Sequence, residues 1–149
     1  MRLTVYNLKF NSDRIGTLVK ESAINYGDTQ ITTQEKAVQI IETLFDASNL
    51  TEEHVWMVAL DGARKTKAVF DISHGTLMSS LVHPREIFTR AILAGAASII
   101  LAHNHPSGML DVSEQDKEVS KRIMLAGHLL GIELDDHIII AENRFVSAM

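Results

Sequence analysis

The chain has 149 residues, 46% of them hydrophobic, and a formal net charge of −5. This length and apolar content exclude a disordered chain and suit one domain with its own core. The absence of cysteine excludes a disulfide framework and a thiolate zinc site, so any bound metal needs His, Asp or Glu ligands. The acidic charge and the lack of a Lys/Arg cluster argue against nucleic acid as a partner.

No segment has the features of an export signal or a membrane span. The N-terminal residues contain no apolar signal-peptide region. The longest nearly apolar run, 91–102, is too short for a bilayer and is interrupted by Gly95 and Ser98. We therefore expect a cytoplasmic protein without a membrane partner.

The first third of the chain predicts one strand and one helix. Apolar and polar residues alternate in 2–10, which predicts a strand at an edge of the sheet. Residues 11–31 are polar with two glycines, and we expect mostly loop there. The capping box Thr32-Thr-Gln-Glu35 then starts an amphipathic helix, expected at 33–47. We divide the chain accordingly into a strand and loop extension, 1–29, and a domain, 30–149.

The middle of the chain predicts a β-hairpin and a helix. Residues 53–60 lead into the turn Asp61-Gly62, and 67–73 provide the antiparallel partner. Residues 77–82 add a further short strand. Pro84 fits the first turn of a helix, where a missing N–H costs nothing, and Gly95 closes that helix. The expected buried face of this helix consists of Ile87, Phe88, Ala91, Ile92 and Leu93.

The last third predicts three strands and one helix. A buried strand at 97–102 is followed by a helix that Ser113 caps and Gly131 ends. Strands at 132–140 and 144–146 then form a final hairpin. The elements together indicate the α/β class, with a mixed β-sheet flanked by helices in a single domain. The expected buried stripe of the last helix consists of Val119, Ile123, Ala126 and Leu130.

Two histidines lie one residue apart just after the buried strand 97–102. In an extended backbone, residues i and i+2 point to the same side, so His103 and His105 can face one point past the strand end. Asp116 falls in the first turn of the next helix. Two imidazoles and one carboxylate are a usual ligand set for catalytic Zn²⁺, with a fourth position left for water. The sequence therefore predicts a zinc site at His103, His105 and Asp116.

The full pattern is His-x-His, seven residues, Ser113, two residues and Asp116, and it resembles the JAMM motif of the MPN (JAB) metallopeptidase superfamily. The surrounding segments 103–108, 82–87 and 136–140 resemble those of the RadC family, the bacterial branch of that superfamily. The resemblance covers residues from about 30 to 149. It implies a single MPN/JAB-like (cytidine-deaminase-like) domain. Long RadC proteins also carry an N-terminal helix-hairpin-helix region, for which we expect no room here.

The resemblance also implies roles for a glutamate and a serine. In the superfamily, a glutamate upstream of His-x-His is the general base and the motif serine, here Ser113 by position, supports the oxyanion. Glu53 leads the apolar strand 53–60 and matches the place of the base. Glu52 is adjacent but points the other way once the strand has begun, and Glu86 lies in the wrong element. Helix capping would by itself also explain Ser113.

The remaining histidines have plainer interpretations. His137 follows two aspartates in a segment that resembles RadC proteins, and we interpret it as a structural residue or a partner of the metal site. The others are expected to be ordinary polar residues: His54, His74, His83 and His128.

Two functions fit these observations. The first is a zinc-dependent hydrolase of the JAMM type, cleaving peptide or isopeptide bonds in an unknown peptide or protein substrate. The second is a RadC-type accessory protein in DNA repair, recombination or mobile-element biology, with a non-catalytic metal site. The intact motif favours the enzyme, since superfamily members without activity usually lack its residues. That motif comprises Glu53, His103, His105, Ser113 and Asp116.

Overall fold

A mixed β-sheet forms the centre of the computed structural model, which describes residues 1–75 and 82–149. Within these residues seven strands pair in the order β2-β1-β4-β3-β5-β6-β7. The pairs β1–β4 and β5–β6 are parallel, and the remaining neighbours are antiparallel. The strands are β1 (Arg2–Phe10), β2 (Gly16–Asn25), β3 (Glu53–Leu60), β4 (Thr66–Gly75), β5 (Ser98–Asn104), β6 (Glu133–Ala141) and β7 (Arg144–Ser147).

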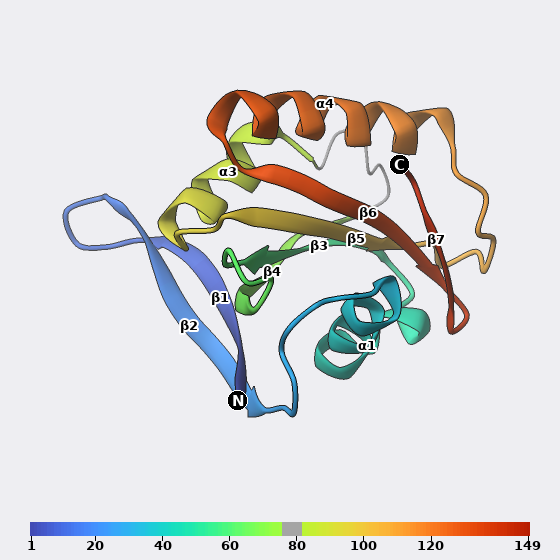
Figure 1. Ribbon diagram of the computed structural model, residues 1–149, viewed down its shortest axis with the longest axis horizontal. Helices are drawn as coiled ribbons and strands as arrows, with labels where there is room; N and C mark the ends of the chain where they lie inside the picture. Colours follow the sequence, from blue (N-terminus) through green and yellow to red (C-terminus); the bar gives the residue numbers. More distant parts are fainter. Residues whose placement is uncertain (76–81) are drawn as a thin grey trace.

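Helices cover both faces of this sheet. The helix α1 (Gln34–Phe45), followed by the short 3-10 turn Ala47–Asn49, lies on one face, while α3 (Pro84–Leu93) and α4 (Glu114–Leu130) lie on the other (Figure 1). Side chains along β3 therefore alternate between two separate cores. Trp56 packs on the α1 side, whereas Val55 and Met57 pack on the side of α3 and α4. This double burial explains why 53–60 is an almost continuous apolar run.

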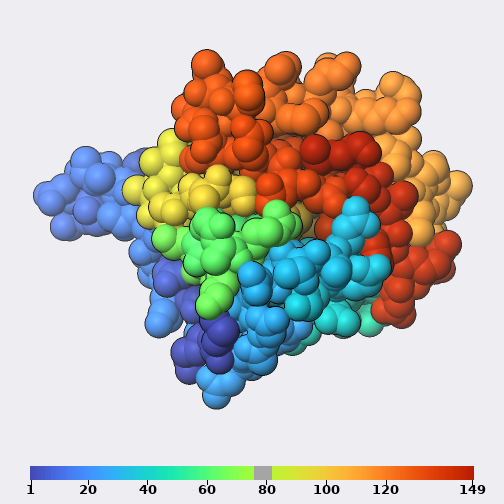
Figure 2. All heavy atoms as spheres, in the orientation of Figure 1, coloured from blue at the N-terminus to red at the C-terminus, as the bar shows by residue number. Residues whose placement is uncertain are grey.

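The N-terminal region differs from the sequence-based expectation. Residues 11–31 were expected to be mostly loop, but β2 occupies Gly16–Asn25 and pairs with β1 along its whole length. The strand at the edge is thus β2, and β1 lies between β2 and β4. No residue of β2 is buried, and the outer end of this hairpin projects from the body of the molecule (Figures 1 and 2). Backbone pairing with β1 holds this strand in place, helped by the half-buried side chains of Leu18 and Ile24 that pack against the two cores.

The predicted helices all form, with corrections in detail. The N-cap of α1 is Thr33, whose side chain accepts from the Lys36 amide at 3.3 Å, so the capping box expected at Thr32 is wrong by one residue. The helices expected after Pro84 and Ser113 are confirmed. Three side chains assigned to buried faces are exposed instead, because the periodicity does not say how far a covered face extends. They are Ile92 (56%), Leu93 (47%) and Leu130 (49%).

The predicted hairpins of the sheet are confirmed. The strands β3 and β4 are antiparallel neighbours, and β6 and β7 are joined by Glu142 and Asn143, both with positive φ. That conformation is typical of a tight hairpin turn. The strand expected at 77–82 lies outside the described residues except for Val82, which is in no strand. In the part of the chain that the structure describes, no helix is long and apolar enough to cross a membrane.

Candidate metal centre

The end of β5 delivers the two motif histidines to one side of the sheet. β5 pairs antiparallel with β3 and parallel with β6, so His103 lies between Val55 and Ile139. The His105 amide donates to the Ile140 carbonyl at 2.9 Å, which continues the pairing beyond the last residue of the strand. With the backbone held extended, both imidazoles turn toward the face covered by α4. His103 is fully buried and His105 half-buried.

The first turn of α4 brings in the carboxylate. Ser113 Oγ accepts from the Asp116 amide at 3.0 Å, and the Ser113 amide donates to Asp116 Oδ2 at 2.9 Å. This reciprocal capping box fixes the start of the helix. It also fixes the rotamer of Asp116, which is 3% exposed and points inward.

Four side-chain atoms of three residues converge at distances compatible with a shared metal ion. His103 Nε2 lies 3.0 Å from His105 Nε2, Asp116 Oδ1 lies 3.2 Å from His103 Nε2, and Asp116 Oδ2 lies 3.5 Å from His105 Nε2. A tetrahedral zinc site with bonds of about 2.0–2.1 Å places neighbouring ligand atoms about 3.3–3.4 Å apart. The observed separations bracket that value, so these three side chains fit a zinc ion.

Glu53 borders the same point from β3. Its carboxylate offers an oxygen within 4.8 Å of ring nitrogens of both motif histidines. The other two glutamates considered from sequence lie elsewhere: Glu52 pairs with His74 at 3.1 Å, and Glu86 pairs with Arg90 at 3.0 Å. The structure therefore brings Glu53, and neither alternative, to the candidate site.

Burial and mutual contacts change the acidity of the site residues. Burial alone would raise the pKa of Asp116, but hydrogen bonds from His103, His105 and the Ser113 amide hold that pKa well below its usual value. The hydrogen bond with Asp116 raises the pKa of His105, although burial opposes it. Burial raises the pKa of Glu53 against the opposing effect of the two imidazoles. A carboxyl group kept less acidic than usual is suited to accept and return a proton near neutral pH.

A buried chain of hydrogen bonds continues behind His103. Its Nδ1 lies 2.8 Å from His137 Nε2, and His137 Nδ1 lies 2.7 Å from Ser120 Oγ. Burial lowers the pKa of His137 to about 3, which leaves this imidazole neutral. His137 is thus in contact with the site, as one of the two interpretations expected. Ser120 was missed, because its position one turn after Asp116 is meaningful only when β6 is placed alongside α4.

Asn104, between the two histidines, was also missed. It points to the other side of the strand, where its side-chain oxygen accepts from the His54 amide at 2.7 Å and its nitrogen donates to the Glu52 carbonyl at 2.9 Å. The alternation of a strand could have signalled this orientation. The bonding partners depend on the register between β3 and β5, which the sequence does not contain.

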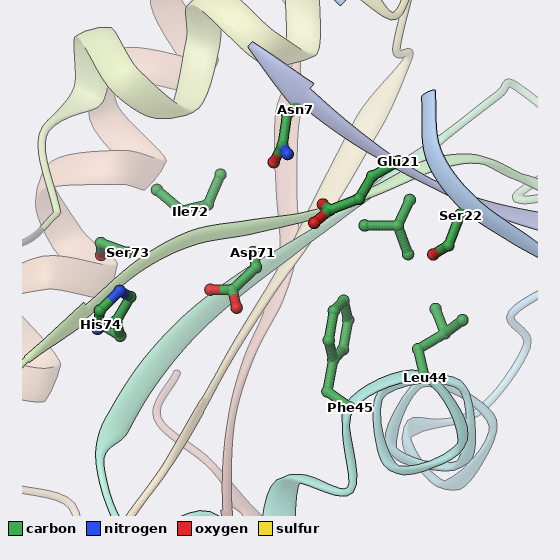
Figure 3. A pocket seen from close by; sticks show the side chains of 10 residues that line it. Asn7, Glu21, Ser22, Leu44, Phe45, Asp71, Ile72, Ser73 and His74 are labelled. Atoms are coloured by element: carbon green, nitrogen blue, oxygen red, sulfur yellow. The ribbon is translucent and has the colours of Figure 1, made fainter. Parts of the chain in front are cut away.

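A second hollow lies on the α1 face of the sheet and shares no lining residue with the metal centre. Figure 3 shows Asp71 and His74 of β4, Glu21 of β2 and Phe45 of α1 around this pocket of about 440 Å³. Beside it, His54 Nδ1 lies 3.0 Å from Asp71 Oδ2, and the His54 ring stacks on Trp56. His54 and His74 therefore have defined partners on the sheet face opposite the candidate site.

Comparison with known families agrees with the geometry. A family profile described as a RadC-like JAB domain matches residues 31–149, which is well over half of the chain. The chain belongs to the RadC-like JAB domain family. The resemblance inferred from the motif is confirmed, as is the expected α/β JAB-like fold. Every residue of the candidate centre lies within the matched part of this RadC-like domain.

The chain is similar to curated proteins of the same family. A "UPF0758 protein" of Rubrobacter xylanophilus is 50% identical over 98 residues, which cover 66% of this chain and 43% of the relative. A "UPF0758 protein" of Desulforudis audaxviator is 42% identical over 132 residues, covering 87% of this chain and 56% of the relative. The chain spans about half the length of the curated relatives it matches. Family membership supports a JAMM-like metal-binding fold.

Proposed function

We propose that this RadC-like domain is a zinc-dependent hydrolase of the JAMM type that cleaves peptide or isopeptide bonds. The observation that carries the proposal is the convergence of His103, His105 and Asp116 at 3.0–3.5 Å, with the Glu53 carboxylate beside them. The JAB superfamily includes hydrolases, which adds support of a general kind. The substrate is proposed to be a peptide or protein.

His103, His105 and Asp116 would hold the zinc ion. The ring of His105 is oriented for this task, because its Nδ1 lies 2.9 Å from the Met109 carbonyl and donates to it, which leaves the Nε2 lone pair facing the site. Zinc supplies a positive charge that lowers the pKa of a water molecule in the site to about 7 and polarises the scissile carbonyl. The ligand set of two imidazoles and one carboxylate leaves that charge partly uncompensated.

Glu53 would act as the general base. Its carboxylate takes the proton of the attacking water and returns it to the leaving nitrogen. The raised pKa of Glu53, caused by burial, favours this return step. The same geometry also allows Glu53 to be a fourth ligand, since its oxygen lies within 4.8 Å of both histidines. Substitution of Glu53 by glutamine distinguishes these roles.

Ser113 would stabilise the oxyanion of the reaction in addition to capping α4. In the capping bond Ser113 Oγ is the acceptor, so the proton of its hydroxyl group is not used in that bond. Ser113 is exposed, which leaves the hydroxyl accessible to a substrate. The two roles are therefore compatible, and the hydroxyl can donate to a developing negative charge.

Metal analysis tests the proposal directly. Protein purified without chelator should contain near-equimolar zinc, and His103→Ala and Asp116→Ala should lose it. The matched control is His128→Ala, which removes an exposed imidazole paired with Glu133. Wild-type protein that neither contains nor takes up zinc would overturn the proposal. Stoichiometric zinc without cleavage of any member of a peptide and isopeptide library would instead favour an accessory protein with a non-catalytic metal site.

A further inference from the structure

We propose that the second hollow, between α1 and the strands β1, β2 and β4, is a binding site for an ammonium or guanidinium group carried on an apolar stem. Its volume of about 440 Å³ lies within the range of small-ligand pockets. The hollow shares no lining residue with the candidate metal centre. The inference is therefore independent of the proposed hydrolase activity.

Two β-bulges shape the lining of the hollow. Glu21 of β2 has no partner position on β1, and Ile72 of β4 is skipped in the pairing with β3. Neighbouring residues of a regular strand point to opposite faces, whereas a bulge changes the direction of a side chain. Glu21 and Ser22 both line the hollow as a result, and so do all residues from 71 to 74. Bulges of this kind are frequent beside functional sites.

The hollow has a charged side and an apolar side. Figure 3 shows the carboxylates of Glu21 and Asp71 on the side of the strands, and Leu44 and Phe45 on the side of α1. The described residues that line it include no lysine or arginine. An alkyl stem can thus lie along Leu44 and Phe45 while its cationic end contacts the carboxylates. The face of the Phe45 ring adds a cation–π attraction for the same group.

No lysine or arginine in the described part of the chain pairs with either carboxylate. Glu21 is exposed and forms no hydrogen bond or ion pair there. Asp71 Oδ2 lies 3.0 Å from His54 Nδ1, but a carboxylate accepts about four hydrogen bonds, so most of its capacity stays open. Burial raises the pKa of Asp71 against the effects of His54 and His74, and the charge of Glu21 adds to the rise. A cation between the two carboxylates would stabilise the ionised form of both.

An organic cation suits this lining better than a metal ion does. In the described residues, the one group of three His, Asp or Glu side chains close enough to hold an ion lies at the candidate metal centre. The apolar half of the hollow would also contribute nothing to a bare ion. A lysine or arginine side chain of a polypeptide, or a free alkylamine, uses both halves.

The single tryptophan of the chain provides a readout for this site. Trp56 is fully buried, and its ring stacks on Phe45 and on His54, with 5.5 Å between the ring centroids in each pair. Phe45 lines the hollow, and His54 contacts Asp71. A ligand that shifts either neighbour should therefore change the fluorescence of Trp56.

Titration of the full chain with model ligands tests the site. Nα-acetyl-lysine amide and Nα-acetyl-arginine amide should change the Trp56 fluorescence saturably, and calorimetry should give the same affinities. Nα-acetyl-norleucine amide carries an apolar stem without the charge and should bind about tenfold more weakly or less, since it lacks charge-assisted hydrogen bonds. Cadaverine distinguishes the two sources of the cation. Tighter binding of the lysine compound indicates a side chain of a polypeptide, and tighter binding of cadaverine indicates a free amine.

Two variants locate the binding. Glu21→Gln should weaken the lysine compound about tenfold, and its exposed position means that the core is not disturbed. Asp71→Asn should have a similar effect. The matched control is Glu133→Gln, which removes an exposed carboxylate beside His128 and should bind like wild type.

Three results would overturn the site. They are the absence of saturable binding by any of the organic cations, equal affinity for the lysine and norleucine compounds, and wild-type affinity in both Glu21→Gln and Asp71→Asn. Zinc content should be the same in these variants and in wild type, because the hollow and the metal centre lie on opposite faces of the sheet. A protein that binds no zinc but binds the lysine compound therefore refutes the proposed function and supports this second site.

Discussion

The side-chain amide of Asn104 forms hydrogen bonds with the backbone on both sides of Glu53. Its oxygen accepts from the residue after Glu53 and its nitrogen donates to the carbonyl before it, at 2.7 and 2.9 Å. The last paired residues of β3 and β5 are Val55 and His103, so this side chain continues the strand pairing where the backbone ladder stops. Asn104 is 1% exposed, which makes both bonds hard to replace with water.

Asn104→Ala should therefore impair hydrolysis more than metal binding. The substitution removes the partner of the partly buried His54 amide and of the Glu52 carbonyl, at a cost on the order of 1 kcal/mol each, and frees the start of β3 to move. We expect kcat to fall and zinc content to stay near wild type. The control is Asn25→Ala, which removes an exposed amide bonded to Arg2. An Asn104→Ala protein with wild-type kcat would show that the two hydrogen bonds of Asn104 do not matter for the reaction.

Glu53→Gln should separate proton transfer from metal binding. Glutamine keeps the size and hydrogen bonding of the side chain but cannot accept the proton, so hydrolysis should fall on the order of 10²–10⁴-fold with zinc retained. Zinc content and the cleavage rate of the same preparation provide the measurement. Glu52→Gln and Glu86→Gln are the controls, because those side chains pair with His74 and Arg90. Loss of zinc from Glu53→Gln would identify Glu53 as a ligand instead.

The same substitution should stabilise the metal-free protein at neutral pH. Burial raises the pKa of Glu53 above its ordinary value, so the folded state favours the protonated carboxyl group. For such a group, stability is fully present below the ordinary glutamate pKa and is lost as the pH rises through the raised one. Urea unfolding of chelator-treated protein should show Glu53→Gln more stable than wild type at pH 7, and the gain should shrink at acidic pH. A gain that grows as the pH falls would contradict the assigned shift.

Gly127→Ala should destabilise the fold although it lies within α4. Alanine favours a helix by about 1 kcal/mol over glycine. A Cβ at Gly127, however, would collide with the Ile132 carbonyl and approach Phe88 Cζ to 3.2 Å. Overpacking of this kind costs about 1–3 kcal/mol, which outweighs the helical gain. Thermal unfolding gives the measurement, and Gly62→Ala, whose Cβ would meet no heavy atom within 4 Å, is the control.

The predictions that succeeded depended on local rules. His103 and His105 point to the same side because side chains in a strand alternate with a period of two. Asp116 was placed in the first turn of a helix because it lies three positions after the N-cap residue Ser113. Both relations hold wherever the chain lies in space. The strand at 53–60 was predicted for a similar reason, since a short apolar run flanked by turn residues is typical of a buried strand.

The failures depended on information from distant parts of the chain. β2 contains no buried residue, so its strand character comes from pairing with β1 and leaves little trace in its composition. Ile92 and Leu130 belong to apolar stripes, but the neighbouring elements do not extend far enough to cover them. The contacts of Asn104 and Ser120 are bonds across strands and between α4 and β6, which depend on register rather than on residue type.

One carboxylate oxygen of Asp116 takes part both in the cap of α4 and in the candidate metal centre. Asp116 Oδ2 accepts the Ser113 amide that starts α4, and it also lies 3.5 Å from His105. Occupancy of the centre and fraying of the helix are therefore thermodynamically linked, because an ion that orders this carboxylate also orders the first turn. We expect loss of a metal ion from the centre to speed hydrogen exchange at the first amides of α4. Any agent that unwinds this first turn should lower the affinity of the centre for the metal by the same free energy.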